Sequence, residues 1–260
     1  ASGSYFKQNG VIGGNQGNSY YERISSRISI DSDVKKWLKV GGNVIFSYSN
    51  SKSLGTSGSY SPLGMALQAS PLWSPLASEE QSKNYPQSAN KNEDGVAYNS
   101  FDGEFLGTSE IWNPMIQITE PIQLFKQDYL NGTMFLEFKF LPCLKLRSSI
   151  NYEMEWKRWN SYSDGYFMNA TNKNPTTSAS ASTNRYGKWT QDNVLTFDKT
   201  FKEAHHLTAM IGSSIEEWKS VGTGSSRTSL YMIPDGNHAW VDNGVDSNGE
   251  QRGSGGYSDE

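Results

Sequence analysis

Glu153 and Glu155 are the residues whose type and spacing first suggest acid–base chemistry. They lie two positions apart, and side chains two apart on a β-strand point to the same face. Hydrolysis of a glycosidic bond uses two carboxylates, but these must flank the bound sugar from opposite sides. Neighbours on one strand face do not provide that arrangement. We therefore expect both glutamates to be structural, and a soluble glycosidase is the weakest functional hypothesis.

Metal and redox sites have equally little support. The adjacent His205 and His206 would point to opposite faces of a strand, and no third metal ligand lies near them. The oxygen-rich stretch 242–250 departs from the EF-hand pattern, because Gly244 falls at the first ligand position. Cys143 is the only cysteine, which excludes a CxxC site. We predict no catalytic residue, no metal site and no cofactor, and we expect the protein not to be an enzyme.

The composition of the chain limits its partners. Only 35% of the 260 residues are hydrophobic, and the formal net charge is −4 without any cluster of basic residues. A nucleic-acid partner is excluded because phosphate-backbone binding requires such a cluster. No stretch reaches the roughly 18 consecutive apolar residues that are typical of a membrane helix. The apolar residues are instead spread along segments in which they alternate with polar ones.

Alternation is clearest at Leu144–Trp156, where the even positions are mostly apolar and the odd positions are polar or charged. Such a segment is a strand with one oily and one charged face. The same pattern predicts six strands, at 20–32, 37–50, 129–140, 143–157, 187–199 and 205–218, preceded by a partial strand at 2–6. Strands of soluble proteins are usually about 5–6 residues long, so these are unusually long.

The connections between the predicted strands also alternate. The links SDVKKW, LPC and TFKEAH are short, whereas the gaps near 51–128, 158–186 and 219–260 are long and rich in Ser, Gly, Asn and Pro. Short turns at one end and long loops at the other are typical of an outer-membrane barrel, whose short turns face the periplasm. The aromatic residues support this by their placement at both ends, as membrane-interface belts: Tyr48, Trp156, Trp189 and Trp218 at the loop end, and Trp37 and Phe201 at the turn end.

Three stretches resemble a known family. YYERISSRISIDSDVKKWLKVGGNVIFSYSNSKS at 20–53, ALQASPLWSP at 66–75 and KWTQDNVLTFDKTFKEAHHLTAMIGSS at 188–214 are similar to segments of SusC/RagA-type TonB-dependent transporters. The resemblance implies a nutrient importer in the outer membrane of Bacteroidetes-like bacteria. Such proteins are barrels of about 22 strands. By family resemblance they carry an N-terminal plug, are energised by TonB, and act with a SusD-like lipoprotein that captures glycans or peptides.

The resemblance and the strand pattern together predict an all-β fold. We expect an antiparallel transmembrane β-barrel segment, with about six to seven of the 22 strands and long extracellular loops. Residues 1–260 would form a partial barrel domain without its plug. The charged faces would line the lumen and the apolar faces would meet outer-membrane lipid, since a polar interior is typical of such barrels. The predicted lumen-facing residues are Arg23, Arg27, Lys145, Arg147, Asn151, Glu153 and Glu155.

The long loops offer candidates for substrate contact. Trp73, Trp112 and Trp240 lie in these loops and could stack on an oligosaccharide or peptide. The alternative hypothesis is a secreted β-sandwich that binds carbohydrate through the same loop aromatics. A sandwich requires two packed sheets, whereas a barrel segment requires one continuous curved sheet with an uncovered apolar face.

Overall fold

The protein is all-β, and its structure, a computed structural model, is dominated by eight long strands. It describes residues 1–13, 19–55, 57–84, 90–92, 94–101, 111–119, 122–163, 165–167, 173–230, 241 and 251–259, with only the backbone of 84, 122 and 251–259. The strands are β1 (Ser2–Asn9), β2 (Tyr20–Lys35), β3 (Leu38–Lys52), β4 (Ile122–Leu141), β5 (Leu144–Ser163), β8 (Ser178–Phe201), β9 (His205–Thr228) and β10 (Gln251–Asp259).

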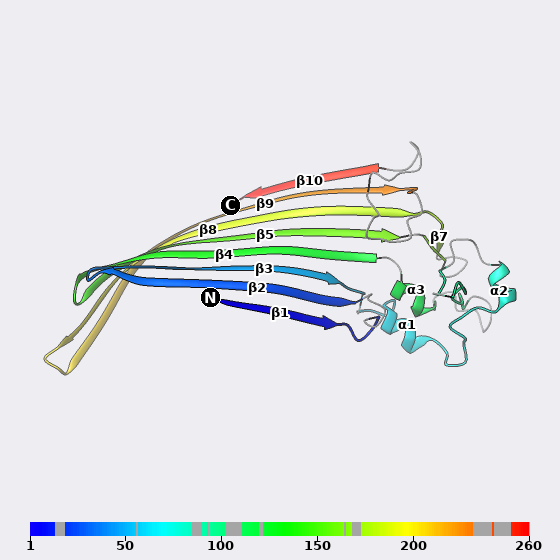
Figure 1. Cartoon of the computed structure of the whole chain (residues 1–260), viewed down its shortest axis with the longest axis horizontal. Coiled ribbons are helices and arrows are strands. Elements are labelled where there is room, and N and C mark those ends of the chain that lie inside the picture. Colours follow the sequence, from blue (N-terminus) through cyan, green and yellow to red (C-terminus); the bar gives the residue numbers. More distant parts are fainter. Residues whose placement is uncertain are drawn as a thin grey trace.

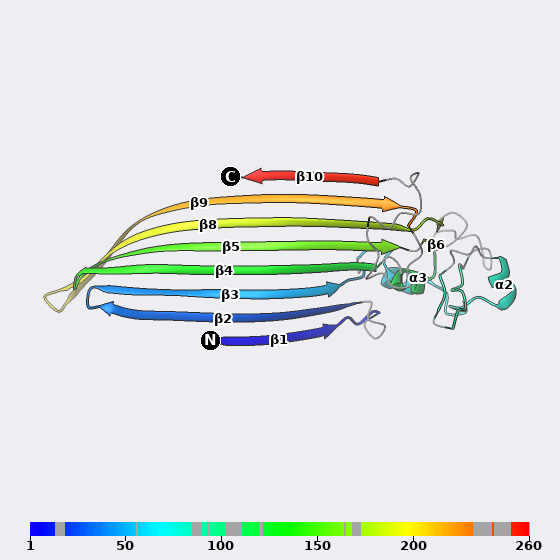
Figure 2. The same ribbon diagram turned by 45° about the horizontal axis from the view of Figure 1, so that its top comes forward.

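These eight strands form one antiparallel sheet in the order β1-β2-β3-β4-β5-β8-β9-β10. Each strand therefore pairs with its neighbour in this sequence-ordered series, as in a meander. Figures 1 and 2 show a single curved sheet whose open edges are β1 and β10. The predicted antiparallel barrel segment is confirmed, although the main sheet has eight strands instead of six or seven.

The apolar face of this sheet is uncovered. Residues opposite each other in paired strands point to the same face, so the register assigns every side chain to a face. On one face, large apolar side chains are exposed from β2 to β9: Ile24, Ile28, Ile30, Val44, Phe46, Met134, Leu136, Ile150, Tyr152, Trp156, Ile211, Ile215 and Val221. The β-sandwich hypothesis requires a second large sheet packed against these side chains. Within the described residues there is none.

The strands extend beyond their predicted ends. β4 and β5 have 20 residues each, and β8 and β9 have 24 each. The extensions of β5, β8 and β9 are rich in Ser, Thr and Asn, so they lack the apolar alternation on which the prediction relied. They are ordered by backbone pairing with the neighbouring strand, as between Ser163 and Ser178. β10 was missed for the same reason, since its sequence QRGSGGYSD has almost no apolar residues.

The connections differ in length at the two ends, as predicted. Two or three residues join β2 to β3, β4 to β5 and β8 to β9. The long connections lie at the opposite end, where Figure 1 also places the helices α1 (Pro62–Gln68), α2 (Glu79–Asn84) and α3 (Pro114–Thr119). A small sheet of β6 (Tyr166–Phe167) and β7 (Lys173–Asn174) belongs to one of these loops. No helix in the described part of the chain is long and apolar enough to cross a membrane.

The packed core also lies at this end. The buried hydrophobic residues of the described chain are in the loops or at the loop ends of the strands: Met65, Ala77, Ala97, Tyr98, Phe101, Ile116, Tyr162, Ala179 and Leu230. We call the packed part of 57–119 the loop cluster. The body of the sheet contributes no member to this set. Among the described residues, the body of the sheet therefore has no hydrophobic core of its own.

The turn between β8 and β9 holds two non-glycine residues in the left-handed region of backbone conformation. Lys202 and Glu203 have φ values of 49° and 60°, and the Ala204 amide donates to the Phe201 carbonyl at 3.2 Å. Positive φ at both central residues is the type I′ geometry that favours Asn-Gly. We expect Lys202→Asn combined with Glu203→Gly to stabilise the fold by about 1 kcal/mol, measured by urea titration in detergent micelles. Ala204→Gly, outside the left-handed region, is the control and should give no gain.

Candidate functional site

The polar face of the sheet carries all seven residues that the sequence predicted to line a lumen. A row of directly paired residues crosses five strands of the sheet: Arg27, Ile45, Asn131, Glu153 and Lys188. Period-two alternation along β2 and β5 places the other predicted residues on the same face: Arg23, Lys145, Arg147, Asn151 and Glu155. The structure thus brings them together on one surface, opposite the exposed apolar side chains.

Several charges on this face form ion pairs with one another. The Lys188 ammonium lies 2.8 Å from the Glu216 carboxylate, and Lys39 lies 2.6 Å from Asp31. Lys157 and Glu155 form another ion pair on β5. Exposed pairs of this kind contribute little to stability. Their effect is to hold a hydrated surface of mixed sign in place.

Phe135 is an apolar residue on this polar face, and the structure explains it. Its ring lies over Gly41 on the neighbouring strand, where an added Cβ would come within 2.5 Å of the ring. The Arg147 guanidinium carbon is 3.9 Å from the ring centroid on the other side. A cation over an aromatic face is attracted by the ring quadrupole. Phe135 therefore fills the space left by a glycine and positions a charged side chain.

Aromatic pairs near the loop end of the polar face were not recognised from the sequence. Tyr186 and Trp218 stack with ring centroids 6.3 Å apart, and Phe125 and Trp159 meet at 5.9 Å. Trp218 pairs in register with Lys188, so its predicted place in an apolar belt beside Trp189 is wrong. The sequence alone could have placed these rings on the polar face, because they occupy the same alternate positions as the charged residues of their strands. Flat rings beside charges can stack on sugar rings or peptide side chains.

Tyr48, Trp156 and Trp189 do lie on the apolar face. The register joins Tyr48 to Asp128 and Asp128 to Trp156, so the two rings share one row across the sheet. Trp189 pairs with Tyr152, four residues nearer the short turns than Trp156. At the turn end, the rings of Trp37 and Phe138 stack with centroids 6.2 Å apart. Aromatic residues therefore stand near both ends of the apolar face, as belts would require.

The loop tryptophans have packing partners of their own. Trp112 stacks on Tyr60 with centroids 5.3 Å apart and packs against the buried pair Tyr98 and Ile116. Trp73 meets the ring of Phe101 at 4.9 Å. Each ring thus contributes to the order of the loop cluster through an aromatic partner of its own. Trp240 and the stretch 242–250 lie outside the described residues.

Asn113 organises the loop cluster. Its fully buried side chain donates to the carbonyls of Pro75 at 2.7 Å and Asn99 at 3.1 Å, and accepts from the Met115 amide at 3.0 Å. Buried polar groups are costly unless all their hydrogen bonds are made. These bonds therefore hold three separate stretches of the long loop together.

Asn113→Ala is expected to loosen the loop cluster by about 1–2 kcal/mol, because buried carbonyls lose their donors. The measurement is hydrogen exchange of residues 57–119, compared with exchange in β4 and β5, which should not change. Asn113→Asp is the matched variant: it retains the acceptor for Met115 but loses both donations. Equal protection in all three proteins would show that the cluster is held by other contacts.

The histidines lie at the start of β9, directly after the turn. His206 contacts the Thr200 hydroxyl through Nδ1 at 3.0 Å and lies 3.7 Å from Asp198 through Nε2. Among the residues that the structure describes, no three His, Cys, Asp or Glu side chains are grouped as a metal site would need.

Comparison with known proteins relates the sheet to a transporter. No known family profile and no curated protein sequence matches the chain. A structure of the RagAB peptide importer in the "open-open" state matches with a TM-score of 0.68 and 16% identity, covering 98% of this chain and 26% of that one. The "closed-closed" state matches with a TM-score of 0.59 and 18% identity, covering 97% and 26%.

A third structure, described as the RagAB peptide transporter, gives a TM-score of 0.63 at 17% identity over 97% of this chain. The chain spans about a quarter of the length of these relatives, since it covers 26% of each. Identity this low shows similarity of fold. These structural neighbours are transporters and not enzymes, in agreement with the sequence resemblance.

Proposed function

We propose that this chain is part of the barrel wall of a TonB-dependent outer-membrane importer of peptides or glycans. The observation that carries the proposal is the sheet with two unlike faces. One face exposes apolar side chains from β2 to β9, and the other carries several ion pairs. A soluble protein buries such an apolar face, whereas a barrel strand turns it to lipid. The fold similarity to a peptide importer supports the same function.

The geometry explains how the wall would work. Antiparallel pairing satisfies the backbone hydrogen bonds between strands, as a hydrocarbon environment requires. The polar face then lines a water-filled lumen, where Arg147, Glu153 and the other charged residues on this face of β5 meet solute or plug. The aromatic pairs Tyr186–Trp218 and Phe125–Trp159 stand on this face near the loop end. There they can provide stacking surfaces for a substrate that enters from outside.

Labelling of single cysteines tests the orientation of the two faces. Cys143 is the only native cysteine, so Cys143→Ser gives a cysteine-free background. In membranes, Asn151→Cys on the polar face should react with a charged, water-soluble maleimide. Ile150→Cys on the apolar face should be protected, because lipid excludes the reagent. Unfolding in urea should make both positions equally reactive, which controls for intrinsic reactivity.

Equal labelling of Asn151→Cys and Ile150→Cys in intact membranes would contradict the barrel wall. Protection of Asn151→Cys with labelling of Ile150→Cys would mean that the faces are reversed. A chain that remains monomeric and fully water-soluble would also count against the proposal. In that case a covering layer must hide the apolar face, as in the β-sandwich hypothesis.

The partners of the importer are proposed from the sequence resemblance. A SusD-like lipoprotein would close over the loop end, where the loop cluster lies. TonB would supply energy through a plug domain. Deletion of the gene should abolish uptake of one class of peptide or glycan, measured with labelled substrates. Unchanged uptake of both classes, together with the absence of a neighbouring gene for a SusD-like protein, would lead us to abandon this assignment.

A further inference from the structure

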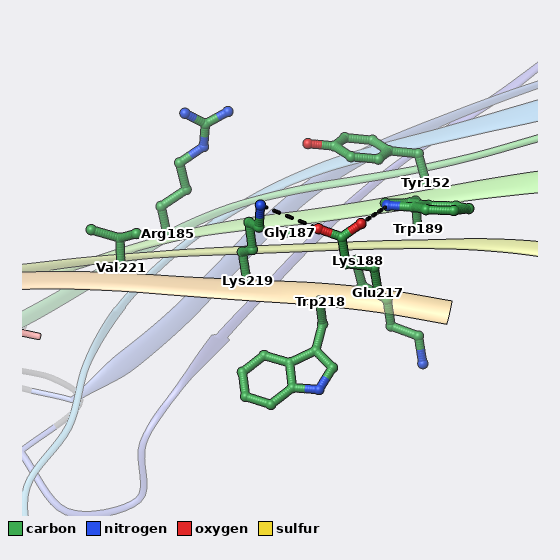
Figure 3. A pocket seen from close by; sticks show the side chains of 9 residues that line it. All are labelled: Tyr152, Arg185, Gly187, Lys188, Trp189, Glu217, Trp218, Lys219 and Val221. Atoms are coloured by element: carbon green, nitrogen blue, oxygen red, sulfur yellow. Dashed lines mark hydrogen bonds and ion pairs between the residues drawn. The ribbon is translucent and has the colours of Figure 1, made fainter. Parts of the chain in front are cut away.

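A hollow of about 260 Å³ lies on the apolar face, where β5, β8 and β9 run side by side. Gly187 forms its floor, since it has no side chain, and the Tyr152 hydroxyl lies 3.6 Å from the position of a Cβ at this glycine. Figure 3 shows Tyr152, Trp189 and Arg185 standing on the same side of the sheet around this point, whereas Trp218 points away from it. The hollow is therefore an opening on the face that would meet lipid.

Three charged residues interrupt the apolar pattern here. They are Arg185, Glu217 and Lys219. The register places them on the same face as Ile211 and Ile215. A Glu217 carboxylate oxygen accepts from the Trp189 indole N–H at 3.0 Å, and the other lies 3.2 Å from the Lys219 ammonium. Figure 3 shows both contacts. Lys219 is therefore already held by a carboxylate, and the register also places it opposite Asp259 of β10.

Arg185 is the cation without a matching carboxylate. Its guanidinium donates to the Met154 sulfur at 3.9 Å, and among the described side chains no carboxylate oxygen lies within 4.0 Å of it. A thioether is a weak acceptor. Arg158, on the same face, differs because it already binds Asp128 at 2.7 Å. Arg185 is therefore exposed and available for an anion.

The height of the hollow fits the boundary of a membrane. Arg185 pairs with Trp156, which is twelve residues along β5 from Leu144 at the turn end. At about 3.3 Å per residue and a tilt of about 40°, this corresponds to roughly 30 Å along the membrane normal. The apolar band of such barrels is about 25 Å tall. The cations thus stand at its outer edge, with Tyr152 and Trp189 just below them.

We propose that this hollow binds the phosphorylated headgroup of a lipid of the outer leaflet. The inference rests on the proposed function, because it requires the apolar face to meet lipid. Arg185 would bind phosphate oxygens through its planar guanidinium, with the ion-paired Lys219 beside it on the next strand. Glu217 holds Lys219 in place. The acyl chains would then lie over Ile150 and Ile215, and the two aromatic rings would border the headgroup.

Lipid retention by the full chain tests this proposal. The protein is purified in neutral detergent micelles containing diphosphoryl lipid A or its dephosphorylated form, and native mass spectrometry counts the bound lipid. We expect selective retention of the phosphorylated form. Arg185→Gln should weaken it at least about tenfold, since a charge-assisted phosphate contact is lost. Lys157→Gln, which removes the same charge from the opposite face, is the matched control and should retain the lipid. Circular dichroism confirms that all variants are folded.

Three outcomes would overturn the proposal. They are equal retention of dephosphorylated lipid, equal loss in Lys157→Gln, and displacement of the lipid by equimolar inorganic phosphate, which would indicate a simple anion site. The cysteine labelling described above separates this inference from the proposed function. If Ile150→Cys is labelled in membranes, both fail. If it is protected but phosphate selectivity is absent, the lipid site alone fails.

Discussion

Ile150→Lys is expected to destabilise the membrane-inserted sheet by about 2–4 kcal/mol, the cost of a lysine on the lipid face near the bilayer midplane. Ile150 lies midway between Leu144 and Trp156 on β5, and its side chain is 49% exposed on the apolar face. In water this exposure would make the substitution harmless or favourable. In lipid the same exposure makes it costly. The free energy of unfolding, from urea titration in lipid vesicles, therefore reports the environment of this face.

Ser149→Lys provides the matched control. Ser149 is the adjacent residue on the polar face, directly paired with Asp192, so a lysine there gains a carboxylate neighbour in water. We expect its effect to remain within about 0.5 kcal/mol, as is usual for exposed substitutions. If the two lysine variants were equally stable in vesicles, the apolar face would not meet lipid. The difference between them is thus more informative than either value alone.

Gly41→Ala is expected to cost about 2 kcal/mol by overpacking. The new Cβ would approach the Phe135 ring to 2.5 Å and the Asp31 Cβ to 3.0 Å. The ring would have to leave its place, and its contact with the Arg147 guanidinium at 3.9 Å would then be lost. Unfolding in urea, followed in detergent micelles, measures the cost. Gly132→Ala on β4 is the control, because there the nearest atom would be 3.8 Å away.

A double-mutant cycle isolates the cause. In a Phe135→Ala background the ring is absent, so Gly41→Ala should cost less than about 0.5 kcal/mol. The coupling energy would then be about 1.5 kcal/mol. Additive effects of the two substitutions would instead show that Gly41 is required for backbone reasons and not because of the ring.

Much of the sheet could be predicted from alternation alone. Strand β5 shows why: the apolar and charged residues from Leu144 to Trp156 separate perfectly by parity at their large side chains, and parity is a local property of a strand. The seven predicted polar-face residues therefore do share one face. The loop ends of the strands were missed because Ser, Thr and Asn alternate with no apolar partner, and β10 was missed because it is rich in glycine.

The sequence by itself determined which face of each apolar–charged strand is oily, since successive side chains must point to opposite sides. The tertiary structure decided what lies beside each residue. Only pairing between distant strands places Phe135 over Gly41, joins Trp189 to Glu217, and leaves Arg185 without a carboxylate next to Trp156. These neighbours are dozens of residues apart in the chain. Their contacts depend on register, which is set by hydrogen bonding across the sheet and not by local alternation.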